Sequence, residues 1–319
     1  MRSPIAIVGA PSSIGIRPYD EGGSRRLDLA PGALREQGLI ARLAAHDRGD
    51  VIPLPYRDFE RQGTRPRNED EVGDYSRALA ERVAAASADG EFVLVLGGDC
   101  SIVLGCLLGA RGAGRVGLVY VDAHADFVSP EESPTGSAAA MCLALAVGRG
   151  DTPLARLGGD RPLARPEDVV LIARRDHADP SAGHDELEAS PILDLPDEAV
   201  REHGVAGTAR AALERLAENE VDGFWIHVDA DVLDPELLPA VDSPTPGGLG
   251  LDELTELVAP LVRHPRALGL ELTIYDPALD PDRSSAAHLA DLLEGVLAVD
   301  ARSGGFADPA GGTRSGGRP

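Results

Sequence analysis

The segment FWIHVDADVLDP at residues 224–235 passes from an apolar run into three closely spaced aspartates. The segment VGLVYVDAHAD at residues 116–126 does the same, with a histidine between its two aspartates after the run. Apolar runs without polar alternation are typical of strands buried on both faces of a parallel sheet. In such sheets ligands gather at the carboxyl ends of the strands, so these two segments predict an α/β fold with a site at that edge.

The rest of the chain repeats this alternation. Further apolar runs predict strands at residues 4–8, 92–96, 169–173 and 267–274. Amphipathic stretches predict helices at residues 24–43, 69–86, 101–110, 208–219, 251–262 and 284–301. Strands that alternate with helices indicate a three-layer α/β/α domain with a mostly parallel sheet. We expect this domain to cover residues 1–302, and the Gly/Pro/Ser-rich residues 303–319 to form a disordered tail.

The composition narrows the classes of function. The 319 residues carry a formal net charge of −23, and such a surface repels phosphate backbones and anionic lipid. We therefore expect neither nucleic-acid nor membrane binding. No run of about 18 apolar residues indicates a membrane span, and the three cysteines suggest no disulfide framework. The prediction is a cytoplasmic protein that acts on a small molecule.

Alternate residues of an extended chain point the same way. Asp122, His124 and Asp126 should therefore share one face, and so should Asp229 and Asp231. Four carboxylates brought together there would repel one another unless divalent cations neutralised them. Carboxylate and imidazole donors suit Mn²⁺, Fe²⁺ or Zn²⁺ better than Ca²⁺, so the spacing predicts a pair of such ions.

Five motifs carry a family resemblance. They are GGDCS at 97–101, DAHAD at 122–126, HVDADVLDP at 227–235, SPTPGGL at 243–249 and GLEL at 269–272. This set resembles the ureohydrolase family of arginase, agmatinase and formiminoglutamase. The resemblance implies an arginase-like α/β/α fold with a mostly parallel sheet of about eight strands. It also implies two Mn²⁺ ions, a bridging hydroxide that attacks a guanidinium or amidine carbon, and a homo-oligomer, either a trimer or a hexamer.

The resemblance also implies roles for single residues. The metal ligands would be Cys100, Asp122, His124, Asp126, Asp229 and Asp231. Asp122 and Asp229 would bridge the ions, whereas Cys100 and Asp126 would complete one of the two sites. Asp126 and Glu271 are candidate catalytic acids, with Glu271 placed behind the metals where it could orient a ligand.

This chain departs from the family pattern in several places. Cys100 stands where most relatives have histidine, and a thiolate favours Zn²⁺ or Fe²⁺ over Mn²⁺. The alternative is that Cys100 is a small buried thiol. Ile274 stands where arginases have the glutamate that grips the guanidinium group. Ala139 replaces a proton-shuttling histidine, and Val128 an asparagine that holds the amino-acid end of the substrate. These losses concern the substrate more than the metals.

Other residues are candidates for contact with the substrate. Thr135 and Ser137 lie in the loop after DAHAD, and Asp176 and Asp179 lie in ARRDHADP at 173–180. Ile274 joins them by its place in the family motif, although a solvated loop is the alternative for the two aspartates. His227 could serve as a general acid to the leaving amine, because strand alternation points it toward the ligands. The alternative is a core histidine that is hydrogen-bonded to a neighbour.

Three functions stay open on the sequence. The first is a binuclear metal-dependent hydrolase of a linear C–N bond in a guanidine, an amidine or a related group. The second is a deacetylase-like amidohydrolase with a single Zn²⁺, which is disfavoured because the sequence has no His-His pair. The third is a catalytically impaired pseudoenzyme of the same fold, which the replacements at Ile274 and Ala139 favour.

Overall fold

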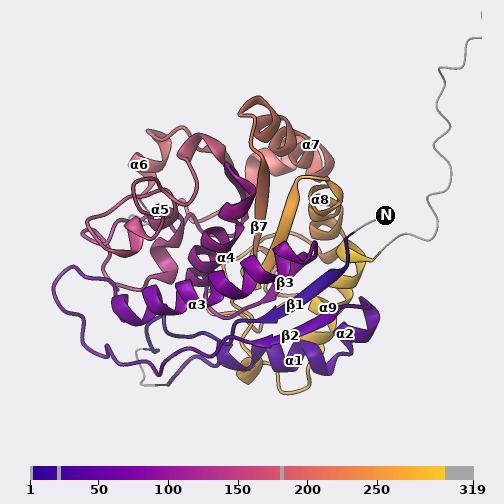
Figure 1. Ribbon diagram of the computed structural model, residues 1–319, viewed down its shortest axis with the longest axis horizontal. Coiled ribbons are helices and arrows are strands. Elements are labelled where there is room, and N and C mark those ends of the chain that lie inside the picture. The colour runs from indigo at the N-terminus through magenta and orange to yellow at the C-terminus, as the bar shows by residue number, and fades with distance from the viewer. Residues whose placement is uncertain (1–2, 20–22, 180–182, 299–319) are drawn as a thin grey trace, which may run out of the picture.

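The computed structural model describes residues 3–19, 23–179 and 183–298, and within them eight strands form one sheet (Figure 1). The spatial order is β2-β1-β3-β8-β7-β4-β5-β6, and every neighbouring pair is parallel. The strands are β1 Ile5–Gly9, β2 His46–Asp50, β3 Phe92–Leu96, β4 Val116–Val121, β5 Val169–Ile172, β6 Leu193–Leu195, β7 Gly223–Asp229 and β8 Ala267–Thr273. The predicted α/β fold is confirmed.

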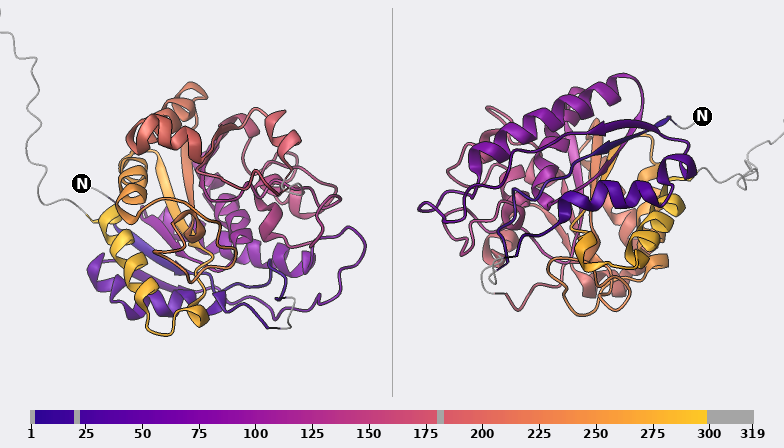
Figure 2. Two further views of the ribbon diagram at one scale, coloured as in Figure 1. Left: turned by 180° about the vertical axis from the view of Figure 1, so that it is seen from behind. Right: turned by 90° about the horizontal axis from the view of Figure 1, so that it is seen from below.

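Helices cover both faces of the sheet and complete three layers. The long helix α3 (Glu69–Ala88) packs with α4 (Val103–Ala110) over one face. On the other face α7 (Asp197–Glu218), α8 (Leu251–Arg263) and α9 (Ser284–Leu297) follow one another side by side (Figures 1 and 2). The shorter helices are α1 Ala30–Glu36, α2 Leu39–Arg42, α5 Cys142–Ala146 and α6 His184–Glu188.

All six predicted strands are present, with ends that agree to within one residue. The two strands that the sequence analysis missed, β2 and β6, lie at the edges of the sheet. The sequence of β2 is HDRGD and largely exposed, and β6 has three residues. An edge strand does not need the apolar run that marks a strand buried on both faces. The sequence therefore did not predict β2 or β6.

The helix predicted over residues 24–43 is wrong as a single element. Gly38 adopts a left-handed conformation with φ of 77°, which separates α1 from α2. The helix predicted at 208–219 is the second part of α7, which kinks at Gly204. The end of the last predicted helix, residues 299–301, and the predicted tail at 303–319 lie outside the described residues.

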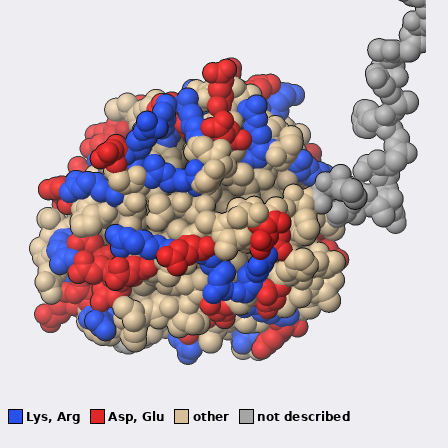
Figure 3. Space-filling model, in the orientation of Figure 1, with Lys and Arg blue, Asp and Glu red and all other residues tan. Residues whose placement is uncertain are grey.

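Acidic and basic side chains are interspersed on the face shown in Figure 3. Arginines pair with more than one acid in places. Arg42, for example, lies 2.6 Å from Asp291 and 2.5 Å from Glu294. Within the described ranges no helix is both long and apolar enough to cross a bilayer.

Candidate metal centre and active site

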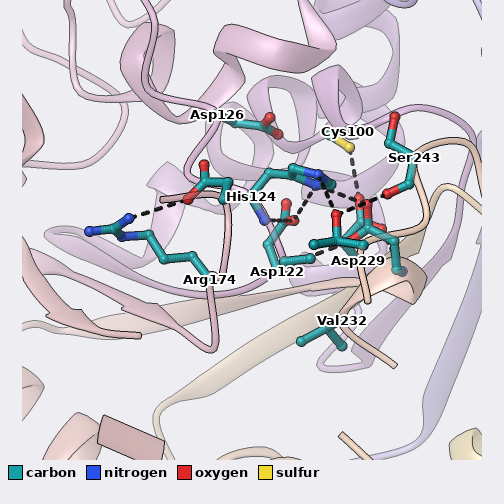
Figure 4. A network of polar contacts seen from close by, with 12 residues as sticks. Cys100, Asp122, His124, Asp126, Arg174, Asp229, Val232 and Ser243 are labelled. Atoms are coloured by element: carbon teal, nitrogen blue, oxygen red, sulfur yellow. Dashed lines mark hydrogen bonds and ion pairs between the residues drawn. The ribbon is translucent and has the colours of Figure 1, made fainter. Parts of the chain in front are cut away.

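Two groups of possible metal donors lie at the carboxyl edge of the sheet, where β3, β7 and β4 end (Figure 4). The donor atoms within each group all lie within 4.8 Å of one another. The first group is Cys100, Asp122, His227 and Asp229, and the second is Asp122, His124 and Asp231. Asp122 belongs to both groups, so the two sites would share one carboxylate.

Short contacts hold these donors together. The Cys100 thiol donates to Asp229 Oδ2 at 2.9 Å, and Figure 4 shows this contact as a dashed line. In the second group His124 Nδ1 lies 3.0 Å from Asp231 Oδ2. The backbone N–H of His124 donates to Asp122 Oδ1 at 2.7 Å, which fixes the shared carboxylate at the end of β4. Contacts within the protein therefore hold the side chains of each donor group close together.

The electrostatics of the centre fit a cation. Burial, together with repulsion from Asp231 and Asp122, raises the pKa of Asp229 well above its ordinary value. Asp122 Oδ2 and His227 Nε2 are buried without a hydrogen-bond partner among the described residues. Buried polar atoms of this kind are costly unless they are paired, and a metal ion would pair both. The residues present therefore fit a divalent metal.

His227 belongs to the first donor group but does not line the pocket. It is fully buried, its Nδ1 lies 2.8 Å from Glu271 Oε1, and its ring stacks on Tyr120 at 4.0 Å between centroids. The Trp225 indole N–H donates to the other oxygen of Glu271. Burial alone would lower the pKa of His227, but its contacts with Asp122 and Glu271 raise it to about 10. This buried position does not favour the predicted role as general acid. Glu271 contacts His227 away from the pocket wall, and its role in orienting a ligand stays a prediction.

Asp126, the sixth predicted metal ligand, lies outside both donor groups. The hydroxyl of Tyr120 donates to Asp126 Oδ2 at 2.7 Å, and the thiol of Cys142 lies 3.5 Å from the same oxygen. Burial and the nearby charge of Asp122 raise the pKa of the Asp126 carboxyl. Asp126 adopts a left-handed backbone conformation, with φ of 47°. The strict strand alternation assumed for the sequence DAHAD therefore fails at its last residue.

A pocket of about 280 Å³ opens onto the centre. Its wall includes Asp126 and five of the six residues in the two donor groups, all except His227. It also includes every predicted substrate-binding residue, namely Thr135, Ser137, Asp176, Asp179 and Ile274. Phe127, Val128 and Ile274 give one part of the wall an apolar surface. The predicted substrate-binding residues therefore come from three separate segments of the chain and line one cavity, and their contact with a substrate stays a prediction.

Asp176, one of the wall residues, links two segments of the chain by hydrogen bonds. Its Oδ2 accepts a hydrogen bond from the backbone N–H of Ala125 at 2.8 Å, and its Oδ1 lies 3.2 Å from Arg174 Nη1. Arg174 is nearly fully buried and pairs also with Asp194 at 2.7 Å. Asp176 therefore ties the DAHAD loop to the end of β5.

Among the wall residues that the sequence did not single out, three are charged: Arg17, Arg25 and Asp242. The guanidinium of Arg25 pairs with Asp242 and lies 4.1 Å above the ring of Tyr19. No pattern in the sequence links these segments, which are more than 200 residues apart. Tyr120 was missed as well, because as an apolar strand residue it gave no signal of its contact with Asp126.

An eight-stranded parallel sheet with carboxylate and imidazole donors at its carboxyl edge is the arrangement that the resemblance to the ureohydrolases implies. The chain belongs to the arginase family, whose sequence pattern matches residues 3–298. The arginase of Bacillus caldovelox is 34% identical over 306 residues, which cover 92% of this chain and 97% of that protein. The arginase of Brevibacillus brevis is 32% identical over 296 residues, or 90% and 97% of the two chains.

Solved structures agree with this assignment. The native structure of the Bacillus caldovelox arginase superposes with a TM-score of 0.84 at 30% identity and covers 94% of this chain and 99% of that chain. The formimidoylglutamase of Bacillus subtilis superposes with a TM-score of 0.71 at 23% identity, covering 93% and 87% of the two chains. The second likeness concerns the fold alone.

Proposed function

We propose that this protein is a binuclear metal-dependent hydrolase of a linear C–N bond in a small molecule. The observation that carries the proposal is the pair of donor groups that share Asp122 and open into one pocket. Divalent ions at such a site supply charge and Lewis acidity for the activation of water. The arginase family uses two Mn²⁺ ions, and the thiol of Cys100 argues that one ion here is Zn²⁺ or Fe²⁺.

The residues of the chain would divide the work. Asp122, shared by both donor groups, would hold the two ions side by side. Asp126 lines the pocket and could accept or return a proton at Oδ2, where Tyr120 now donates. Glu271 would orient His227 from behind, as carboxylates commonly do for ligating histidines. Assembly into trimers or hexamers remains a prediction of the family resemblance.

The wall of the pocket argues against an ordinary guanidinium substrate. Ile274 lines the pocket at the end of β8, where its side chain can make no charge-assisted hydrogen bond. Ala139 is likewise buried and offers no acid or base. We therefore propose that the group recognised is less cationic than a guanidinium, such as an amidine or a related C–N group.

The test is a substrate panel on protein loaded with Mn²⁺, Zn²⁺ or Fe²⁺. Amidines, guanidines, formimino compounds and linear amides would be assayed for release of ammonia, amine or urea. We expect metal-dependent turnover of at least one class, lost in Asp229→Asn and kept in Asp234→Asn, a matched change outside both donor groups. Tight metal binding without turnover of any class would favour the pseudoenzyme instead.

A further inference from the structure

The donor group around Cys100 differs in composition from the one that the family resemblance implies. The fourth donor near Cys100, Asp122 and Asp229 is His227, and Asp126 is absent from the group. Thiol, imidazole and carboxylate donors in a set of four are typical of a zinc site. With His227 in place of Asp126, the site has one more nitrogen donor and one fewer carboxylate than the resemblance implies.

Two protein contacts fix the orientation of His227. In the register of the sheet, His227 pairs with Tyr120 on β4 and with Glu271 on β8. The Tyr120 ring lies parallel to the imidazole, at 8° between planes, and Glu271 contacts Nδ1. A carboxylate oxygen accepts a hydrogen bond, so Nδ1 carries the hydrogen. A metal ion at Nε2 would take the place of the second proton of the ring and bind the lone pair of that nitrogen.

The Nε2 atom of His227 points toward the carboxylate of Asp122. It lies 3.7 Å from Asp122 Oδ2, too far for a hydrogen bond, and neither atom has another partner within the described chain. Donor atoms about 2.0–2.3 Å from a tetrahedral ion are themselves separated by more than 3 Å, so the gap suits two ligands of one ion. A histidine that ligates through one nitrogen and meets a carboxylate with the other is the usual arrangement around metals.

Asp126 is held away from this group at the same time. Its Oδ2 accepts the hydroxyl of Tyr120, the same residue whose ring stacks on His227. Tyr120 therefore has two contacts that matter here: its ring packs against His227, and its hydroxyl holds Asp126 by a hydrogen bond.

We propose that Cys100, Asp122, His227 and Asp229 form a four-donor site that prefers a thiophilic ion such as Zn²⁺, with His227 in the place that Asp126 was expected to fill. The donors Asp122, His124 and Asp231 are left for a harder ion such as Mn²⁺. The inference rests on the proposed function for its metal centre, but it concerns binding and does not require turnover.

The first experiment titrates metal-free protein with Co²⁺, because a bond between thiolate and Co²⁺ gives a charge-transfer absorption band. We expect the band in wild-type protein, its loss in Cys100→Ser and unchanged affinity in Asp126→Asn. His227→Gln should weaken binding about tenfold or more. A band that vanishes in Asp126→Asn and persists in His227→Gln would overturn the assignment.

The second experiment uses the wild-type chain, because His227 is buried and its replacement could disturb folding. X-ray absorption of protein with one equivalent of Zn²⁺ should show sulfur and imidazole nitrogen around the same ion. Sulfur with oxygen alone, or imidazole without sulfur, would overturn the inference. Zn²⁺ bound in this way by a protein without turnover would support the site and contradict the proposed function. Turnover by a protein whose Zn²⁺ has no imidazole ligand would support the proposed function and contradict the proposed site.

Discussion

Asp122 Oδ2 and His227 Nε2 face each other across 3.7 Å in the interior of the protein, and neither finds a hydrogen-bond partner among the described residues. The two residues lie on neighbouring strands, one at the end of β4 and the other within β7. These two atoms meet only each other, at a distance that leaves room for a third partner. A metal ion bound by both would satisfy them.

Removing the charge of Asp229 should affect metal-free and metal-loaded protein differently. Burial and neighbouring acids raise the pKa of Asp229, so its ionised form costs stability at neutral pH and that cost grows as the pH rises. Metal-free Asp229→Asn should therefore melt no lower than wild type. A metal at 100 times its Kd should add about 2.7 kcal/mol to wild type. Differential scanning calorimetry should show the full gain in wild type and Asp234→Asn and a smaller gain in Asp229→Asn, which keeps the donor group of Asp122, His124 and Asp231.

Ile274→Glu should restore recognition of guanidines. The new carboxylate would enter the pocket wall at the end of β8, where a charge-assisted hydrogen bond contributes about 1.5–3 kcal/mol. The expected result is a KM for a guanidine substrate about 10–100 times lower, measured by urea release. Ile274→Gln has a similar size without the charge and should show a smaller gain. Weaker guanidine turnover in Ile274→Glu than in wild type would contradict the explanation for this position.

Asp176→Ala should loosen the DAHAD loop. The change leaves the N–H of Ala125 without its acceptor and removes one of the two carboxylates that pair with buried Arg174. We expect the free energy of unfolding in urea to fall by about 2–3 kcal/mol, with weaker metal binding. Asp176→Asn keeps an acceptor for Ala125 and should lose less. Equal stability of Asp176→Ala and wild type would show that the loop is anchored elsewhere.

Gly269→Ala should disturb the metal centre from behind. A Cβ at this position would overlap the ring of Trp225 and the carbonyl oxygen of Val93. Overpacking of a core usually costs about 1–3 kcal/mol, and here it would move the indole that hydrogen-bonds to Glu271. We expect a lower melting temperature together with weaker Co²⁺ binding. Gly32→Ala is the control, since a Cβ there meets nothing within 4 Å and the change should stabilise α1 slightly.

The parts of the fold that sequence could predict are those with a strong local signal. Strands buried on both faces read as uninterrupted apolar runs, and so the six strands other than the two at the edges were found. The edge strand β2 is mostly charged, and the edge strand β6 has only three residues, so neither contains an apolar run. The break at Gly38 was missed because an amphipathic pattern continues on both sides of it, and the left-handed turn is set by this one residue.

The candidate site was predictable where spacing alone decides the geometry. Asp122 and Asp229 end neighbouring strands, so their meeting follows from the sheet. The contact of His227 with Glu271 depends on the register of β7 against β8, which no local pattern reveals. The turn of Asp126 toward Tyr120 depends on a left-handed backbone conformation, which alternation along a strand cannot predict.

The metal content of the purified protein shows whether the two donor groups hold two ions. Protein purified without chelators and supplied with Mn²⁺ and Zn²⁺ would be analysed by elemental mass spectrometry beside Asp122→Ala, which removes the residue shared by both donor groups. We expect about two ions per wild-type chain and the loss of both in the variant, because each group depends on Asp122. A wild-type chain that retains no ion after reconstitution would rule out the binuclear centre, and a variant that still binds two would rule out the shared carboxylate.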